Sequence, residues 1–148
     1  MTEKKGSILI DDVPINLANN ISWYNKISYS SEKSYLIDDT LLTNITLSTD
    51  ISLTDYEHLN KILKMTKILS EKNNYEINLD QKLGEVGKNL STGQKQRISL
   101  ARALYKKSEI LILDETTNAV DEITQDKIMD EIFSYAKDNG ITVIVVSH

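Results

Sequence analysis

Two adjacent carboxylates follow an apolar segment in the last third of the chain. Asp114 and Glu115 come directly after residues 110–113, Ile-Leu-Ile-Leu, which predict a buried strand. A carboxylate in such a place can hold Mg²⁺, and its neighbour can orient and polarise an attacking water molecule. An isolated acidic pair often only caps a turn. We therefore interpret this pair together with the motifs that accompany it.

A polar segment upstream has the composition of a helix start. Residues 90–97 read Leu-Ser-Thr-Gly-Gln-Lys-Gln-Arg and lead into residues 98–106, where apolar side chains recur at helical spacing. Ser91 and Gln94 fit the S-x-x-Q capping box. A serine hydroxyl and a glycine at a helix N-terminus also favour a bound phosphate. The two interpretations are compatible, because one serine can cap a helix and face a phosphate when one arrives.

The last third predicts one strand–helix–strand unit. Residues 110–113 and 141–146 are near-continuous apolar runs, typical of parallel strands covered on both faces. Residues 122–137 have the pattern of an amphipathic helix, and Gly140 is placed as its stop. The two runs begin about 30 residues apart, which suits a βαβ unit.

Such a unit brings the residues that follow its two strands to the same edge of the sheet. Ligands of parallel sheets bind outside the carboxyl ends of the strands. Here those ends carry Asp114 and Glu115 on the first strand, and Ser147 and His148 on the second. We therefore expect two acids and an imidazole to converge.

The first half of the chain has weaker patterns. Residues 8–15 predict a short peripheral hairpin, and residues 27–29 a further strand. Residues 30–34 are too hydrophilic to be buried, so we expect a surface loop. Residues 54–69 predict a helix that begins with a capping box from Thr54 to Glu57.

Composition excludes several classes of function. The 148 residues carry 17 Lys and Arg against 22 Asp and Glu, a net charge of −5, with no Cys and two His. An acidic chain without a basic block is not expected to bind nucleic acid as its main partner. The lack of Cys excludes disulfides and Cys-ligated zinc and fits a reducing compartment. The longest apolar runs have four residues, whereas a spanning helix needs roughly 20. No apolar signal stretch follows the N-terminus, so nothing predicts secretion.

Four segments together resemble the motifs of ATP-binding cassette (ABC) ATPases. Residues 90–97 resemble the ABC signature, residues 110–115 the Walker B strand with its adjacent glutamate, residues 118–121 the D-loop, and His148 the switch histidine. Any one of these would be a weak signal. Their common order and spacing, from about Gly6 to the last residue, make the resemblance specific.

Two further segments resemble the exporter type of this family. Residues 84–87, Gly-Glu-Val-Gly, are similar to a segment that contacts the membrane domains, and residues 36–45 to the stretch after the Q-loop. The resemblance implies an α/β fold, a partial P-loop NTPase (ABC ATPase) domain with parallel core strands, a helical subdomain and an N-terminal antiparallel β piece. The implied parts are residues 1–45 (β piece and Q-loop region), 46–106 (helical subdomain with the signature) and 107–148 (Walker B, D-loop and switch-histidine unit).

The resemblance also implies roles in MgATP hydrolysis. Asp114 would position Mg²⁺, and Glu115 would act as general base on the hydrolytic water. His148 would contact the γ-phosphate of ATP and help to hold that water.

Other residues are implied to bind the nucleotide across a dimer. The implied cofactor-binding residues are Ser91, Thr92, Gly93, Gln94, Glu32 and Asp121. Ser91, Gly93 and Gln94 would meet the γ-phosphate of ATP on the opposite subunit, because this family sandwiches two nucleotides between head-to-tail domains. Asp121 would lie at that interface. The implied partners are a second nucleotide-binding domain and the transmembrane domains of a transporter, at the cytoplasmic face of the cell membrane.

The sequence departs from the family pattern at two places. Glu32 stands where the Q-loop has glutamine, with Ser31 as an alternative alignment one position away. A carboxylate there changes the charge near the γ-phosphate. The larger departure is that no G-x-x-x-x-G-K-[ST] loop, the Walker A motif, occurs in the 148 residues.

We therefore expect a fragment of an exporter ATPase domain that is inactive alone, because this loop supplies much of the positive charge that holds the phosphates. The alternative is a non-catalytic interaction module in which residues 54–106 dock a membrane partner or a complementary domain. A chromosome-associated ATPase is disfavoured, because those proteins flank a long coiled coil and no heptads appear.

Overall fold

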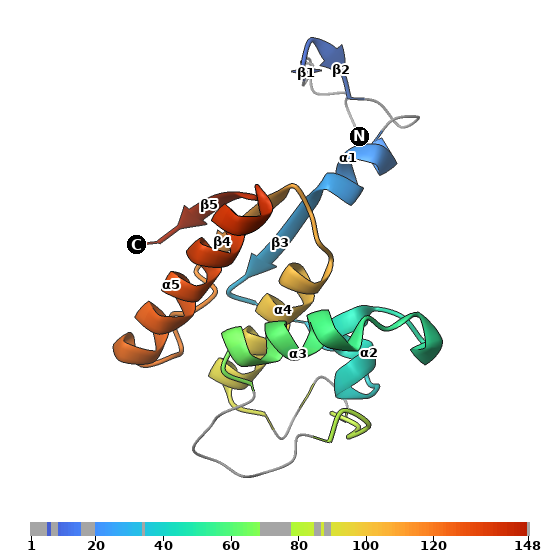
Figure 1. Ribbon diagram of the computed structural model, residues 1–148, viewed down its shortest axis with the longest axis vertical. Coiled ribbons are helices and arrows are strands. Elements are labelled where there is room, and N and C mark those ends of the chain that lie inside the picture. The colour runs from blue at the N-terminus through green and yellow to red at the C-terminus, as the bar shows by residue number, and fades with distance from the viewer. Residues whose placement is uncertain are drawn as a thin grey trace.

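A parallel sheet organises the part of the chain that the computed structural model describes, residues 6, 9–15, 20–33, 35–68, 78–84, 87 and 90–147. Its strands, in the spatial order β3–β4–β5, are β3 (Ile27–Ser31), β4 (Ile110–Asp114) and β5 (Thr142–Val146). Both pairings are parallel. A separate antiparallel hairpin, β1 (Leu9–Ile10) with β2 (Val13–Pro14), lies beyond α1 (Asn20–Lys26) from the sheet (Figure 1). The predicted hairpin and C-terminal βαβ unit are confirmed.

Five further helical segments complete the described fold. They are α2 (Leu41–Thr46), the 3₁₀ turn η1 (Ile51–Leu53), α3 (Tyr56–Met65), α4 (Thr92–Tyr105) and α5 (Glu122–Asn139). Among these residues no helix is both long and apolar enough to cross a membrane. α4 contacts α2, α3, β3 and β4, so it is the central element of the fold.

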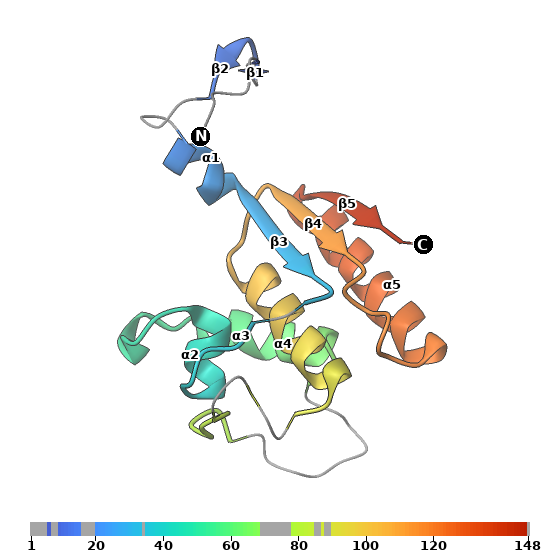
Figure 2. The same ribbon diagram turned by 180° about the vertical axis from the view of Figure 1, so that it is seen from behind.

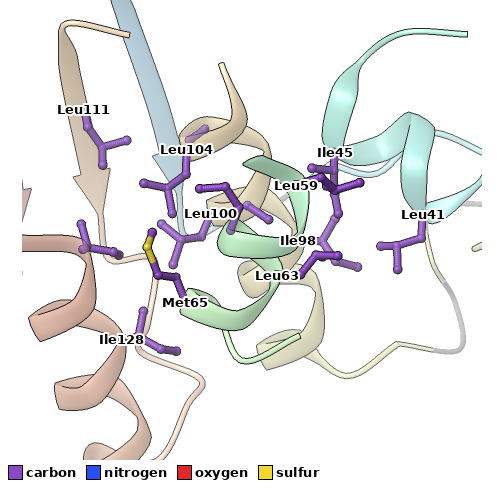
Figure 3. Packing of buried hydrophobic residues seen from close by; sticks show 14 of the residues in the cluster. Leu41, Ile45, Leu59, Leu63, Met65, Ile98, Leu100, Leu104, Leu111 and Ile128 are labelled. Atoms are coloured by element: carbon purple, nitrogen blue, oxygen red, sulfur yellow. The ribbon is translucent and has the colours of Figure 1, made fainter. Parts of the chain in front are cut away.

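The core lies between one face of the sheet and the helices. Leu111 and Leu113 of β4 are buried in one core with Ile128 of α5 and Leu100 of α4. Figure 3 shows Leu111 on the side of the sheet where Leu100 and Ile128 lie. Successive residues of a strand point to opposite faces. The residues between these leucines, and their neighbours in register, therefore define a second face.

That second face is open in the described structure. Tyr29, Ile112 and Ile144 lie side by side in register on it, and Tyr29 and Ile144 are 56% and 47% exposed. Figure 2 shows the sheet from this side, with α5 behind it. The prediction that both faces of these strands are covered is therefore wrong for this chain: β5 is at an edge and is covered on one face only.

The surface loop predicted for residues 30–34 is confirmed for Glu32 and Lys33, which lie in an exposed bend, but it is wrong for Ser30 and Ser31. β3 continues through Ser30 and Ser31, and Ser30 is almost completely buried. Its hydroxyl bonds to the hydroxyl of Ser99 on α4, with 3.2 Å between the oxygens. A hydroxyl that finds a partner can be buried at low cost, so the hydrophilic composition did not exclude burial.

The capping residue predicted for the start of α3 is wrong, whereas the one predicted for the end of α5 is confirmed. α3 is N-capped by Asp55, whose carboxylate accepts from the backbone N–H of His58, and not by Thr54 in a capping box. Asp is a better N-cap than Thr, and only one residue can occupy that position. Gly140 ends α5 in the left-handed conformation, as predicted.

Three short helical segments, α1, α2 and η1, have no counterpart in the sequence predictions. α2 is tied to α4 by Arg102, which donates to the carbonyl oxygens of Asn44 and Tyr35 and to Oδ1 of Asn44. The side chain of Asn44 in turn bonds the backbone of Ile37 in both directions. The stretch after β3 is thereby fastened to α4, the helix that Ser91 caps.

Candidate functional site

The acidic pair lies where strand β4 ends. Asp114 is its last residue, opposite Val146 of β5, and the N–H of Glu115 donates to the carbonyl of Val146 at 3.1 Å. Glu115 has a φ of +51°, the left-handed region that non-glycine residues seldom adopt. This conformation turns the chain sharply after the strand, and such outliers cluster at functional sites.

Asp114 is held by a tyrosine on the neighbouring strand. The hydroxyl of Tyr29 donates to Oδ2 of Asp114 with 2.7 Å between the oxygens. Both side chains point from the open face of the sheet, since Tyr29 pairs in register with Ile112, two residues before Asp114. The hydrogen bond to Asp114, aided by partial burial, raises the pKa of Tyr29.

Glu115 is contacted by the turn that follows it. The side-chain amide of Asn118 donates to Oε2 of Glu115 at 2.9 Å. The next residue, Ala119, donates its backbone N–H to Oε1 of Gln96 on α4 at 3.1 Å. The turn thus lies between the acidic pair and the helix that begins at the signature-like segment.

Asp121 ends this turn and caps α5. Its carboxylate accepts from the backbone N–H of Thr124 at 3.0 Å. Hydrogen bonds from Thr124 lower the pKa of Asp121, with a further contribution from the charge of Lys127. Asp121 is exposed, so a structural cap does not prevent its carboxylate from facing a partner.

The N-terminus of α4 has the predicted capping box. Ser91 Oγ accepts from the N–H of Gln94, and the Gln94 side chain accepts from the N–H of Ser91. Ser91, Thr92 and Gln94 are exposed. Gly93 is different: a Cβ there would lie 2.8 Å from the carbonyl oxygen of Ala119. Glycine is therefore required by the close approach of the turn, besides any role toward a phosphate.

Both candidates for the Q-loop residue lie at the end of β3. Ser31 is opposite Asp114 in register, and its hydroxyl bonds the carbonyl of Lys33 at 3.1 Å. Glu32 follows in a bend and is exposed. The structure thus brings Ser31 beside Asp114, with Glu32 one residue further along.

Two of the segments discussed above are described incompletely. His148 lies outside the described residues, as do Glu85 and Val86 of the segment 84–87. The described part contains no cluster of three or more acidic or histidine side chains that could hold a metal ion. A magnesium ion needs fewer, because it is usually bound by one or two carboxylates together with substrate phosphates.

Sequence reasoning gave no individual role to three residues that support the site. Tyr29, Asn118 and Gln96 bond the acidic pair or the turn beyond it. Asn118 is three residues from Glu115, a spacing that a turn brings together, so it could have been found. Tyr29 and Gln96 depend on contacts between distant segments, which no local pattern reveals.

The comparisons with known proteins agree with this arrangement. The sequence profile of the family described as ABC transporter matches residues 1–118. An export ATP-binding/permease protein of Rickettsia typhi is 42% identical over 94 residues, 64% of this chain and 16% of that protein. The microcin-J25 export ATP-binding/permease protein of Escherichia coli is 43% identical over 91 residues, 60% of this chain and 15% of that protein.

A solved structure gives the same result for the fold. The structure of a bacterial Atm1-family ABC exporter with ATP bound has a TM-score of 0.82 and 29% identity, and the alignment covers 97% of this chain and 25% of that one. Ligands of parallel α/β sheets bind outside the carboxyl ends of the strands, and the acidic pair lies at such an end. The chain belongs to the ABC transporter family. The resemblance to an exporter-type nucleotide-binding domain and the α/β fold class are thereby confirmed, and the chain spans about a sixth of the length of these curated relatives.

Proposed function

We propose that this chain is part of the ATP-hydrolysing domain of an ABC exporter, in which MgATP binding and hydrolysis drive transport. The proposal rests on the arrangement of the two carboxylates at the end of β4. Asp114 and Glu115 stand there side by side, one bonded by Tyr29 and the other by Asn118. Two carboxylates with separate supporting bonds suit two separate tasks.

The residues present fit a magnesium ion. Carboxylate oxygens are the ligands that Mg²⁺ prefers, and Asp114 presents a carboxylate on the open sheet face. Asp114 would hold the ion, which supplies charge neutralisation at the phosphates of ATP. Glu115 would accept a proton from the attacking water and orient it, and His148 would contact the γ-phosphate.

The open face and the free edge of the sheet offer a place for a phosphate-binding loop beside Asp114. Tyr29, Ile144 and Val146 expose apolar surface beside Asp114. We place the segment that carries the Walker A loop against this surface. The 148 residues contain no such loop, so the chain alone would not hold the phosphates and would not turn over ATP.

The signature segment would act on a second nucleotide. Ser91, Thr92 and Gln94 are exposed around the N-terminus of α4, and a helix N-terminus attracts an anion. In a head-to-tail dimer Ser91, Gly93 and Gln94 would meet the γ-phosphate bound to the partner domain. Asp121 would lie at the interface, and Glu32 near the γ-phosphate. The transmembrane domains would be the other partner, so the chain would work at the cytoplasmic face of the membrane.

The test uses the complete protein that carries this chain. Glu115→Gln should abolish ATP turnover and leave ATP binding intact, whereas Glu57→Gln, an exposed glutamate of α3, should change neither. Turnover that survives Glu115→Gln would contradict the proposal and favour a non-catalytic docking module. Mg²⁺-dependent turnover by the 148-residue chain alone, lost on Glu115→Gln, would contradict the proposed inactivity of the fragment.

A further inference from the structure

A chain of contacts joins helix α4 to the carboxylate of Glu115. Gln96 of α4 is 1% exposed, and its Oε1 accepts from the backbone N–H of Ala119. Asn118, the preceding residue, donates its side-chain amide to Oε2 of Glu115. We propose that Gln96 is a positioning residue, which sets the place of the Glu115 carboxylate by holding the turn of residues 116–120. This inference rests on the proposed role of Glu115 as general base.

Gln96 is suited to hold the turn because it is buried on a rigid element. A buried amide oxygen without a hydrogen-bond donor costs free energy, because it has lost its contact with water. The state in which Gln96 accepts from Ala119 is therefore favoured over the state in which this hydrogen bond is broken. The neighbouring Gln94 has a different task, since its side chain bonds the N–H of Ser91 in the capping box. Gln94 thus stabilises the start of α4, whereas Gln96 holds the turn that follows Glu115.

The same turn approaches α4 closely at a second position, Gly93. A Cβ on Gly93, three residues before Gln96, would lie 2.8 Å from the carbonyl oxygen of Ala119. Residues three apart lie on one face of a helix. The absence of a side chain at Gly93 therefore lets the carbonyl side of Ala119 approach α4 closely, while Gln96 bonds its N–H.

Glu115 needs such support. Its φ of +51° directs the chain out of the strand, so the regular geometry of β4 does not by itself orient its side chain. Thr116 and Thr117, which begin the turn, are buried, and the N–H of Val120 closes the turn on the carbonyl of Thr117 at 3.0 Å. A compact turn of this kind transmits the position of Ala119 to Asn118, and Asn118 bonds the carboxylate.

The experiment compares two substitutions of Gln96. Gln96→Met keeps the size of the side chain and removes the acceptor, whereas Gln96→Glu keeps an oxygen at the same place. Gln81→Met, at an exposed glutamine, is the matched control. Three measurements are made: amide hydrogen exchange of Ala119 and the side-chain carboxyl ¹³C resonance of Glu115, both in this chain, and steady-state ATPase kinetics (kcat and KM) of the complete protein.

We expect Gln96→Met to accelerate exchange at Ala119 and to lower kcat, each about tenfold, the effect of roughly one lost hydrogen bond. KM should stay within about twofold, because the base acts in the transition state and not in substrate binding. The Glu115 resonance should shift. Gln96→Glu should remain nearer to the unsubstituted protein in all three, and Gln81→Met should equal it.

Several results would overturn the inference. These are an unchanged Glu115 resonance in Gln96→Met, a raised KM with unchanged kcat, or an equal loss of kcat in both Gln96 variants while Ala119 stays protected. If the complete protein shows no turnover at all, the proposed function fails. The Glu115 resonance and Ala119 exchange then still decide whether Gln96 positions that carboxylate.

Discussion

The phenol of Tyr29 donates a hydrogen bond to Oδ2 of Asp114 across strands β3 and β4, with 2.7 Å between the oxygens. Each residue lies in a different segment of the chain, and the parallel register alone brings them together. The bond orients the carboxylate through one oxygen. It therefore fixes the direction in which Asp114 presents its other oxygen at the open sheet face.

This bond predicts coupling between the two side chains. Tyr29→Phe and Asp114→Ala should each lower the free energy of unfolding slightly, and the double variant should lose less than the sum, because the shared bond can be lost only once. Urea unfolding of the four proteins measures the coupling. Tyr24→Phe, at an exposed tyrosine of α1, should show none with Asp114→Ala. Strict additivity for Tyr29 would mean that the contact has no energetic weight.

Substitutions at Ser91 separate its cap from its proposed contact with a phosphate. Ser91→Ala should lower the free energy of unfolding by about 1 kcal/mol, since the N-cap acceptor for Gln94 is lost. Ser91→Asp should retain stability, because Asp caps as well as Ser, yet it should abolish ATP turnover in the complete protein by placing a negative charge beside the phosphates. Chemical unfolding and an ATPase assay measure the two effects. Retained turnover in Ser91→Asp would contradict a phosphate contact.

The elements with strong periodicity could be predicted from the sequence. The runs that became β4 and β5, the helix between them and the capping box at Ser91 are as predicted, apart from ends that differ by a few residues. Each depends on local patterns: apolar runs, a 3.6-residue repeat or a cap spacing. The acidic pair could be located for the same reason, since it follows the most apolar of these runs.

The remaining features depend on partners that are distant in sequence. Ser30 is buried because Ser99 faces it from α4, and Tyr29 reaches Asp114 because two strands pair in parallel. α2 is only six residues long, too short for a repeat to be detected, and it is held by Arg102. No window of sequence contains both members of these contacts, so propensity and periodicity could not reveal them.

The bonds of Arg102 predict a large effect for a conservative substitution. Arg102→Lys should lower the free energy of unfolding by about 2 kcal/mol, because an ammonium cannot reach the carbonyl oxygens of Tyr35 and Asn44 and Oδ1 of Asn44 together. Thermal and urea unfolding measure the loss. With Asn44→Ala already present, Arg102→Lys should cost less, since one of its acceptors is gone. An equal cost in both backgrounds would argue against this network.

His58 lies in an unusual place for a titrating side chain. Its ring is near those of Tyr105 and Tyr135, with centroid distances of 5.4 and 6.2 Å. Within the described part of the chain its buried Nε2 has no hydrogen-bond partner. Burial, and then the charge of Lys107, lower the pKa of His58, while Asp55 and the backbone carbonyls of α4 act in the opposite direction.

A lowered pKa of His58 predicts less stability in acid. The unfolded chain takes up this proton near pH 6.5, while the folded chain does so only at lower pH, so the free energy of unfolding should fall as the pH drops below about 6.5. His58→Phe keeps a ring beside Tyr105 and removes the titration, so its stability should depend less on pH. Urea unfolding of both proteins between about pH 5 and 7.5 measures the difference. His148 is present in both proteins, so any contribution from it cancels in the comparison. Parallel pH profiles would show that the environment of His58 does not disfavour its charged form.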